Sequence, residues 1–476
     1  GDFTNNGLVN LTTTGQLNIS TGNFSNTNTG TFTIGTTGRI TTTTGSFSNS
    51  GTITYSAAGR LYLGGNYTNS GTFTLTNGGL VYLIGTAANQ SIQGFTCTGL
   101  VSMTKTAGTA TLTSDVTAGG LTLSGLGGTL NLVSGTHTFN GTLTRTNGTL
   151  NCGSSLLRIG ASVSASAAAI NVGTGTVEYY RAGNQTAAVL VYNNLILSGS
   201  GTKTFATTPT VNGKFTLGGT AIVTVTTGVV TYGSNATLQY DNTNVRNVSA
   251  EEWISPFTAS GGVIINGTNT ITLTAAKVFS ATSTILSSPL TITSIGKLAT
   301  GGNSLTLGGN FVNNGTFTST GPIVIADVLT NQNIDGFTTT GLVSMTKTSG
   351  TAIFDGNVNG AGLTINGTGG TLNLGSGLTH TFTGAVTLTN GTLNGGSSTM
   401  NVNFTGSAWT GSGTNFIAGT GIVNFGGGAQ TLATASTFND LTFSNSGLKT
   451  LTGLPTINGI LSMEGTTTVS AIPTYG

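Results

Sequence analysis

The sequence predicts an all-β chain folded as a parallel β-solenoid (β-helix), with three short strands per coil of about 20–23 residues. Three observations lead to this prediction. A glycine-led unit recurs at a short interval, apolar and polar residues alternate within it, and only 5% of the 476 residues are charged. Globular domains usually carry roughly a quarter charged residues, and disordered chains are poor in aromatic residues. With 21 Phe and 10 Tyr, the chain is better explained by an ordered repeat.

The first element of the repeat is G-x-aromatic-x-Asn, which begins at residues 1, 22, 45 and 65. In a solenoid each coil contacts only its neighbours, so each coil must offer the same residue at the same place. We therefore expect the aromatic side chains to stack in one interior column and the asparagine amides to form a ladder in one corner column. These predicted structural ladders contain Phe3, Phe24, Phe47 and Tyr67, and Asn5, Asn26, Asn49 and Asn69.

Two further glycine-led elements complete each coil, and both show a period of two, as in FTIG and LYLG. This alternation predicts Leu, Ile, Val and Phe pointing inward, with Thr and Ser pointing outward on a pleated surface. Gly and Asn are expected at the corners, because corners need φ > 0. Successive coils lie roughly 4.8 Å apart, so a charge at a repeating position would repel its own copies. About 21 coils are expected at this period.

A larger duplication overlies the coils. SIQGFTCTGLVSMTKTAGTATL at residue 91 matches NIDGFTTTGLVSMTKTSGTAIF at residue 333, and similar matches make residues 60–217 and 304–463 two copies. The intervening segment 218–303 is irregular and contains a candidate loop at 241–258. With only 6 prolines and no evident linker, the sequence predicts one continuous solenoid over residues 1–476.

Charge and cysteine content restrict the partners. The 13 Lys and Arg are scattered singly, which argues against a nucleic-acid partner, and no apolar run is long enough for a membrane span. Cys97 and Cys152 could pair if they lie close together, but the second copy has Thr339 and Gly395 in their places, so the architecture does not require a disulfide. The chain starts at Gly1 rather than Met, and we interpret it as a segment of a longer secreted precursor.

Candidate chemistry is sparse. Enzymes on solenoids need converging carboxylates, and this chain has only 11 acidic residues, so we predict no catalytic residues, no metal and no cofactor. His137 and His380 hold matching positions in the two copies and are interpreted as residues at strand starts. A weak candidate for a sugar-binding patch comprises Arg246, Glu251, Glu252 and Trp253. The alternative for this cluster is a solvated loop whose Trp covers an edge of the core.

The stretches YNNLILSGSGTKTF, GNYTNSGTFTL and VRNVSAEEW resemble the Gly/Thr/Asn-rich β-strand-repeat extracellular surface proteins of Bacteroidota-type bacteria. The resemblance covers most of the chain. It implies a cell-surface location with an adhesive or filamentous role, and it assigns no catalytic residues.

The first functional hypothesis is a structural extracellular protein, a subunit or segment of a surface filament or stalk that assembles end to end with its own copies. The alternative is a carbohydrate-binding adhesin with surface polysaccharide as its partner. Lesser alternatives are a polysaccharide-active β-helix enzyme and an ice-binding protein. Sequons such as those at Asn66 and Asn314 are glycosylation acceptors in secreted proteins.

Overall fold

The computed structural model describes residues 1–75, 78–86, 89–165, 169–280, 288–326 and 331–476. The chain divides into two compact units, unit 1 (Gly1–Gly233) and unit 2 (Ser234–Gly476). Within the described residues nearly all structure is parallel β in stacked coils, about 23 turns in all, which confirms the predicted β-solenoid. No α-helix occurs in these residues, and one 3-10 turn spans Gly413–Asn415. There are more turns than expected because some coils are shorter than 20 residues; Thr176, for example, pairs with Asn194.

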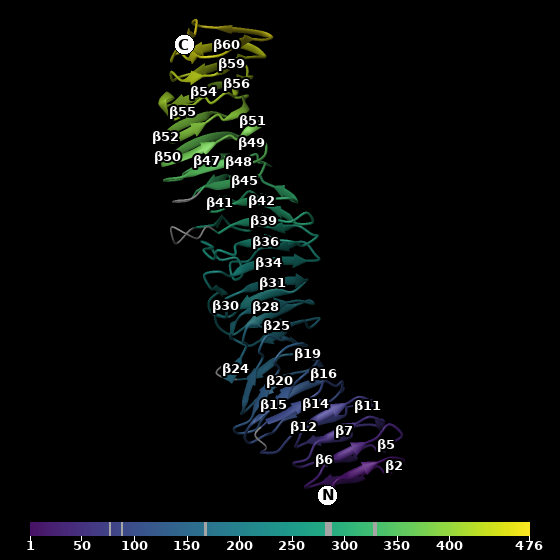
Figure 1. Ribbon diagram of the computed structural model, residues 1–476. Helices are drawn as coiled ribbons and strands as arrows, with labels where there is room; N and C mark the ends of the chain where they lie inside the picture. The colour runs from purple at the N-terminus through teal and green to yellow at the C-terminus, as the bar shows by residue number, and fades with distance from the viewer. Residues whose placement is uncertain (76–77, 87–88, 166–168, 281–287, 327–330) are drawn as a thin grey trace. The chain divides into compact units, whose positions relative to one another are not determined.

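In unit 1 the coils begin as a three-sided stack, and the strands of each side lie one above another (Figure 1). The first side holds β1 (Phe3–Asn5), β4 (Phe24–Asn26), β7 (Phe47–Asn49), β10 (Tyr67–Asn69), β13 (Asn89–Ile92), β15 (Thr109–Leu112), β18 (Thr129–Asn131), β21 (Thr149–Asn151) and β24 (Ile170–Asn171). The second holds β2 (Leu8–Leu11), β5 (Thr31–Ile34), β8 (Thr52–Tyr55) and β11 (Thr72–Leu75). The third holds β3 (Gln16–Ile19), β6 (Arg39–Thr42), β9 (Arg60–Leu63), β12 (Leu80–Leu83), β14 (Leu100–Met103), β17 (Gly120–Leu123), β20 (Leu143–Arg145) and β23 (Val163–Ala165).

The later coils of unit 1 continue with three further sets of parallel strands. One set is β16 (Val116–Ala118), β19 (Thr136–Phe139), β22 (Leu156–Ile159), β25 (Thr176–Tyr179), β28 (Asn194–Leu197) and β31 (Lys214–Gly219). The others are β26 (Gln185–Ala187), β29 (Thr202–Phe205) and β32 (Ile222–Val225), and β27 (Val191–Tyr192), β30 (Thr210–Val211) and β33 (Thr231–Tyr232).

Unit 2 repeats this construction. Its largest set of strands is β34 (Thr237–Asn242), β36 (Val263–Ile265), β38 (Lys277–Val278), β39 (Leu290–Ile292), β41 (Leu305–Leu307), β42 (Phe311–Asn313), β44 (Ile323–Ile325), β45 (Gln332–Ile334), β47 (Leu342–Met345), β48 (Thr351–Phe354), β50 (Gly362–Asn373), β52 (Val386–Asn394), β54 (Gly406–Gly411), β55 (Phe416–Ile417), β57 (Gln430–Leu432), β60 (Ser446–Leu451) and β63 (Thr466–Val469). The remaining sides are β35 (Arg246–Asn247), β37 (Ile271–Thr272), β40 (Lys297–Ala299) and β43 (Thr316–Thr318); β46 (Phe337–Thr338), β49 (Val358–Gly360), β51 (Ser376–Phe382), β53 (Ser397–Val402), β56 (Ile422–Phe425), β59 (Asp440–Phe443) and β62 (Leu461–Met463); and β58 (Thr437–Phe438), β61 (Thr456–Ile457) and β64 (Thr474–Tyr475).

The strands are short and alternate between buried and outward-facing residues, as β5 does with two Thr outside and Phe32 and Ile34 fully buried. The boundary between the units falls inside the segment 218–303 that the sequence marks as irregular. Within that segment residues 248–262 carry no strand, whereas the first part of the predicted loop 241–258 contains the end of β34 and the whole of β35. The loop lengthens one coil, so that Leu238 pairs with Val263, 25 residues further on.

The four aromatic residues of the opening repeat form one column. Phe3 pairs with Phe24, Phe24 with Phe47, and Phe47 with Tyr67 in the parallel register. Ring centroids are 5.7, 4.3 and 5.6 Å apart along the column, and the first two pairs are stacked. The last three rings are fully buried, whereas Phe3 is half-buried. Because identical rings repeat at the coil spacing, each ring packs against its own counterpart.

The asparagines at the neighbouring corner form a second column. Each Nδ2 donates to the Oδ1 of the next coil's asparagine, from Asn5 to Asn26 at 2.8 Å, Asn26 to Asn49 at 2.8 Å and Asn49 to Asn69 at 2.7 Å. The same Nδ2 groups also donate to backbone carbonyls at the start of the next strand, as Asn49 does to Thr72 at 3.1 Å. An amide has two donors, so one column links the coils and satisfies the turn at once.

The corner glycines correct one expectation. In the opening coils they do not adopt positive φ. A Cβ on Gly45 would instead collide with the carbonyl oxygen of Gly22, and one on Gly51 with the carbonyl oxygen of Gly30. Here glycine is required because the corner backbones of successive coils approach closely. Positive φ does occur at later corners, such as Gly153 (61°) and Gly173 (67°).

We expect Phe47→Ala to lower the free energy of unfolding by about 3–5 kcal/mol, because it leaves a cavity inside the aromatic column. Asn49→Ala should cost about 1–3 kcal/mol, because it leaves buried polar groups without partners. Urea denaturation followed by circular dichroism measures both. Thr36→Ala, at an exposed turn, is the control and should change the stability by less than about 0.5 kcal/mol. If both column variants unfold with the parent, the columns do not hold the coils together.

Candidate functional site

The predicted sugar-binding patch is not a surface. Trp253 and Glu252 have no exposed area, and Arg246 is only 7% exposed. The Trp253 ring packs inside the coil against Tyr240 and Phe279, with centroids 6.0 and 5.7 Å away. The loop after β35 folds inward and fills the lengthened coil, so these side chains cannot stack on a ligand. The alternative interpretation is right that Trp253 covers the core and wrong that the loop is solvated, because Arg246 and Glu252 are buried.

The charges of this loop are held inside the coil. The backbone N–H of Ser249 donates to the Glu252 carboxylate at 2.9 Å, and the Arg246 guanidinium lies 3.8 Å from the same carboxylate. The Lys277 Nζ donates to the carbonyl of Trp253. Burial lowers the pKa of Lys277, and the nearby Glu252 opposes this shift. The cluster therefore serves to place the loop in the interior, while Glu251 is half-buried at its edge.

The two cysteines do not pair. Cys97 and Cys152 are both buried free thiols. Burial raises the pKa of each to about 12, and backbone hydrogen bonds to Cys97 offset part of that shift. A buried, protonated thiol is a poor nucleophile and a poor metal ligand, so both residues act as small core side chains.

The matched histidines are also interior residues. The His137 Nε2 lies 3.0 Å from the Leu132 carbonyl oxygen, and the His380 Nε2 lies 2.8 Å from that of Leu374. Since a carbonyl only accepts, Nε2 carries the proton in both rings. Burial lowers the pKa of His380, although its backbone hydrogen bonds raise it in part, and its Nδ1 accepts from the Val358 N–H at 3.1 Å. Each ring therefore donates a hydrogen bond to a backbone carbonyl at the corner before its own strand.

Buried glutamines were missed from the sequence. Gln90 and Gln332 occupy matching positions in the two copies, as do Gln185 and Gln430, and all four are buried. The amide of Gln332 donates to the carbonyls of Leu307 at 2.9 Å and Gly309 at 2.6 Å, and the other three also bond to corner carbonyls of an earlier coil. The recurrence of NQ or AQ before a polar residue, as in NQSI, NQTA, NQNI and AQTL, is the signal that could have revealed them.

Two buried lysines stand beside these glutamines in the sheet. Lys203 pairs with Gln185 and Lys449 with Gln430 in the parallel register. The Lys203 ammonium donates to the carbonyls of Arg181, Gly183 and Ser200 at 2.6, 3.1 and 3.1 Å. The Lys449 ammonium binds the carbonyls of Gly427 and Gly428 and the Oε1 of Gln430 at 2.6, 2.9 and 2.8 Å. Burial, with a contribution from Arg181, lowers the pKa of Lys203 to about 8. These lysines donate hydrogen bonds to the backbone carbonyls of the corners, as the amides of the asparagine column do.

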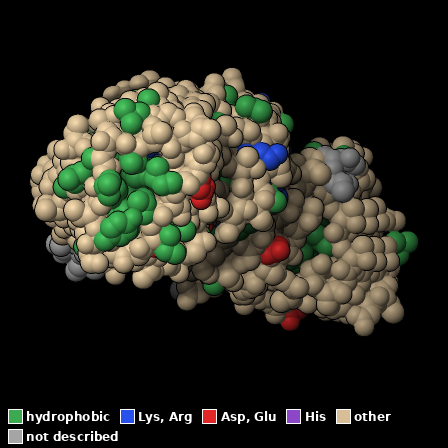
Figure 2. Space-filling model, turned by 90° about the horizontal axis from the view of Figure 1, so that it is seen from above, with side chains coloured by type: hydrophobic (Ala, Val, Ile, Leu, Met, Phe, Trp, Pro, Cys, Tyr) green, Lys and Arg blue, Asp and Glu red, His purple; other side chains and the backbone are tan. Residues whose placement is uncertain are grey.

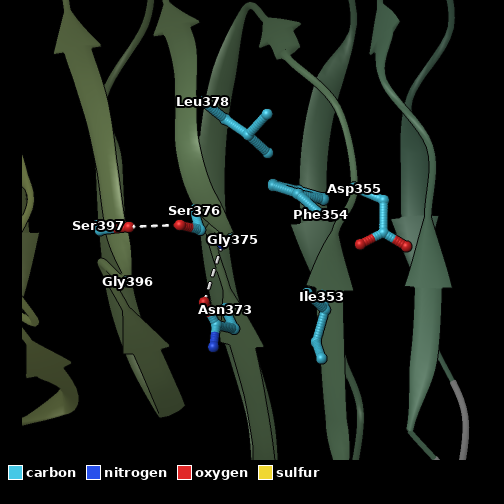
Figure 3. A pocket seen from close by; sticks show the side chains of 9 residues that line it. All are labelled: Ile353, Phe354, Asp355, Asn373, Gly375, Ser376, Leu378, Gly396 and Ser397. Carbon is cyan, nitrogen blue, oxygen red and sulfur yellow. Dashed lines mark hydrogen bonds between the residues drawn. The ribbon is translucent and has the colours of Figure 1, made fainter.

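One surface pocket lies in unit 2 and is called the Asp355 pocket. It has a volume of about 550 Å³, and three consecutive coils supply its lining (Figure 3). Ser376 and Ser397 face each other and share a hydrogen bond of 2.8 Å, and the Oδ1 of Asn373 accepts from the Gly375 N–H at 2.9 Å. The lining residues are Ile353, Phe354, Asp355, Asn373, Gly375, Ser376, Leu378, Gly396 and Ser397.

The pocket combines polar and apolar groups. Asp355, Ser376 and Ser397 are exposed, whereas Ile353 and Leu378 are half-buried. The Phe354 ring belongs to the core and is only 1% exposed. Among the described residues none donates a hydrogen bond to the Asp355 carboxylate or forms an ion pair with it. This arrangement can bind a ligand through one carboxylate, an amide and two hydroxyls, with aliphatic contacts on both sides.

Metal centres and membrane spans were the other possible features of the residues that the structure describes. No group of three or more His, Cys, Asp or Glu side chains in this part of the chain is placed to hold a metal ion. No helix among the same residues is long and apolar enough to cross a membrane.

The buried thiols predict a loss of stability in alkali. Their pKa rises from an ordinary value of 9.0 to about 12 in the folded chain, so folding favours the protonated form. This contribution is complete below about pH 9 and is lost as the pH rises from 9 towards 12. We expect the urea midpoint of the parent to fall more steeply over pH 9–11 than that of a C97T/C152A variant, in which Thr copies Thr339 of the second copy. Parallel pH profiles for the two proteins would contradict this assignment.

Comparison with known proteins gives no relative: no family model, no curated protein and no solved structure matches this chain.

Proposed function

We propose that this chain is a structural element of an extracellular surface, a segment or subunit of a filament or stalk, rather than an enzyme. The observation that carries the proposal is the pair of side-chain columns in unit 1, where identical residues of successive coils contact each other in register. A chain that repeats the same contact coil after coil gains cohesion along the stack. Neither column creates a site for a small molecule.

The outer surface supports the same role. On the face seen in Figure 2, Lys, Arg, Asp and Glu side chains are few, and most of the surface is backbone and uncharged polar side chains. Outward residues pair like with like across coils, as Thr31, Thr52 and Thr72 do. Such a surface offers little charge for steering a soluble substrate. An extracellular location is part of this proposal.

Self-association is the partner interaction that we propose. A coil pairs with its neighbour through backbone hydrogen bonds and like-on-like side chains, and a further coil of the same pattern meets both requirements. A contact of this head-to-tail kind does not close on itself and therefore propagates.

A carbohydrate-binding adhesin is the second candidate. The Asp355 pocket favours it, since that pocket joins hydrogen-bonding groups to aliphatic walls on the outside of unit 2. The two roles are compatible, because the columns lie in the interior and the pocket lies on the surface.

A structural role predicts mechanical resistance along the columns. Pulling the chain by its ends in a force spectrometer should give discrete unfolding events. Asn26→Ala combined with Asn49→Ala should lower the force of the events in the opening coils, because all three links between Asn5 and Asn69 in the amide column are lost. Thr36→Ala is the control and should leave the force unchanged. Smooth extension at low force, without discrete events, would count against a load-bearing role.

Self-association predicts linear particles. The purified 476-residue chain, imaged by negative-stain electron microscopy at rising concentration, should form fibres one solenoid wide that lengthen with concentration. Sedimentation velocity on the same samples should show a matching increase in mass. A single monomeric species at every concentration would remove self-assembly from the proposal and leave a monomeric spacer.

A further inference from the structure

The internal duplication makes a comparison of the Asp355 pocket with its counterpart informative. The polar residues are shared: Asn373, Ser376 and Ser397 of the second copy correspond to Asn131, Ser134 and Ser154 of the first. The differences concentrate on the rest of the lining. Asp355 replaces Thr113, Gly375 replaces Val133, Ile353 replaces Thr111, Phe354 replaces Leu112, and Leu378 is an insertion.

Gly375 lines the pocket at the position where the first copy has Val133. Val133 has a positive φ of 56° and projects a side chain that is 44% exposed. Gly375 has a φ of 82°, and a Cβ there would collide with the carbonyl oxygen of Phe354 and lie 2.9 Å from the Leu378 Cδ1. A β-branched residue at positive φ is strained, whereas glycine adopts this conformation freely. In the second copy the backbone of Phe354 and the side chain of Leu378 therefore take the place that a Cβ would need at this position.

The inserted residue builds one wall. TLNLVSGTHTF of the first copy becomes TLNLGSGLTHTF in the second, and the register of β51 against β53 shifts between Ser376 and Thr379. An extra residue in one strand produces a β-bulge, which redirects nearby side chains and is common beside functional sites. Here the bulge leaves Leu378 half-buried on the rim of the pocket. Figure 3 shows Leu378 and Ile353 on either side of Phe354.

The exchange of Thr113 for Asp355 adds a carboxylate to this space. The Asn373 Oδ1 is occupied by the Gly375 N–H, and no described residue accepts from its Nδ2. The pocket thus presents a carboxylate acceptor, an amide donor and two hydroxyls next to aliphatic walls. One carboxylate is too few for a calcium or magnesium site, which needs about six oxygen ligands. The negative charge also disfavours an anionic ligand.

We propose that the Asp355 pocket binds a neutral hexose unit of an oligosaccharide. The ring hydroxyls donate to Asp355 and exchange hydrogen bonds with Asn373, Ser376 and Ser397. The apolar C–H groups of the sugar contact Ile353 and Leu378. The first copy keeps the shared polar residues but has Thr113 in place of the Asp355 carboxylate and no counterpart of Leu378, so it does not bind. Sugar binding at this pocket stands apart from the structural role, and loss of one leaves the other intact.

Saturation-transfer NMR and calorimetry on the full chain test this assignment. The probes are β-1,4-linked hexasaccharides of glucose and of N-acetylglucosamine, and an α-1,4-linked glucose hexasaccharide. At least one should bind the parent. Asp355→Thr, which installs the residue of the first copy at an exposed position, should weaken that binding about 10-fold or more. Leu378→Ala should weaken it less, through lost aliphatic contact.

Matched controls come from the first copy. Thr113→Ala should leave the affinity unchanged, and circular dichroism should show the same fold for all variants. The assignment is overturned if no probe binds the parent or if Asp355→Thr binds as tightly as the parent.

Discussion

In-register parallel pairing of successive coils is the constraint on which the rest of this structure depends. Each residue of a coil sits beside its counterpart in the next coil, so every position must be compatible with its own copy. Two kinds of contact satisfy this condition. The rings of Phe24 and Phe47 stack with centroids 4.3 Å apart, and the side-chain amides of the asparagine column form hydrogen bonds of 2.7–2.8 Å. A repeated charge satisfies this condition poorly, although Arg39 and Arg60 do pair in register on β6 and β9. Glycine at tight corners follows from the same constraint, because the carbonyl of the previous coil occupies the space of a Cβ.

Corners are the places where this constraint leaves backbone groups without strand partners. The chain satisfies them with a small set of buried polar side chains, each suited to a different corner. Asparagine serves the opening coils, glutamine and lysine serve corners such as those at Gln185 and Lys203, and histidine serves the corners before β19 and β51. Buried polar groups are stable only when they are bonded, and these residues are bonded to the carbonyls that would otherwise be orphaned. The interior is therefore held by specific bonds as well as by apolar packing.

Some coils depart from regular in-register pairing, and two of these departures bear on the interior and on the surface. The coil at residues 238–263 takes in an extra loop and buries it, with Trp253 filling the added space. The bulge before Thr379 takes in one extra residue and keeps it on the surface. The first change adds to the core, and the second shapes a pocket. A repeat architecture can thus acquire a local site without disturbing the coils above and below it.

The sequence by itself determined the fold class and the contents of the columns. A period of two within short glycine-led elements allows only strands, and recurrence of the same residue every coil places Phe47 on Phe24 and Asn49 on Asn26. These features depend on neighbouring coils alone, so they can be read locally. Only the tertiary structure decided that Trp253 and Glu252 are buried, because whether a loop folds inward depends on the space inside a lengthened coil. It also decided that Cys97 and Cys152 are unpaired core residues. In the opening coils it decided that the corners need glycine because the backbones of successive coils approach closely, and not because of positive φ. The Asp355 pocket was beyond the sequence for the same reason: a single inserted residue changes which side chains meet, and that outcome is set by the packing of three coils together.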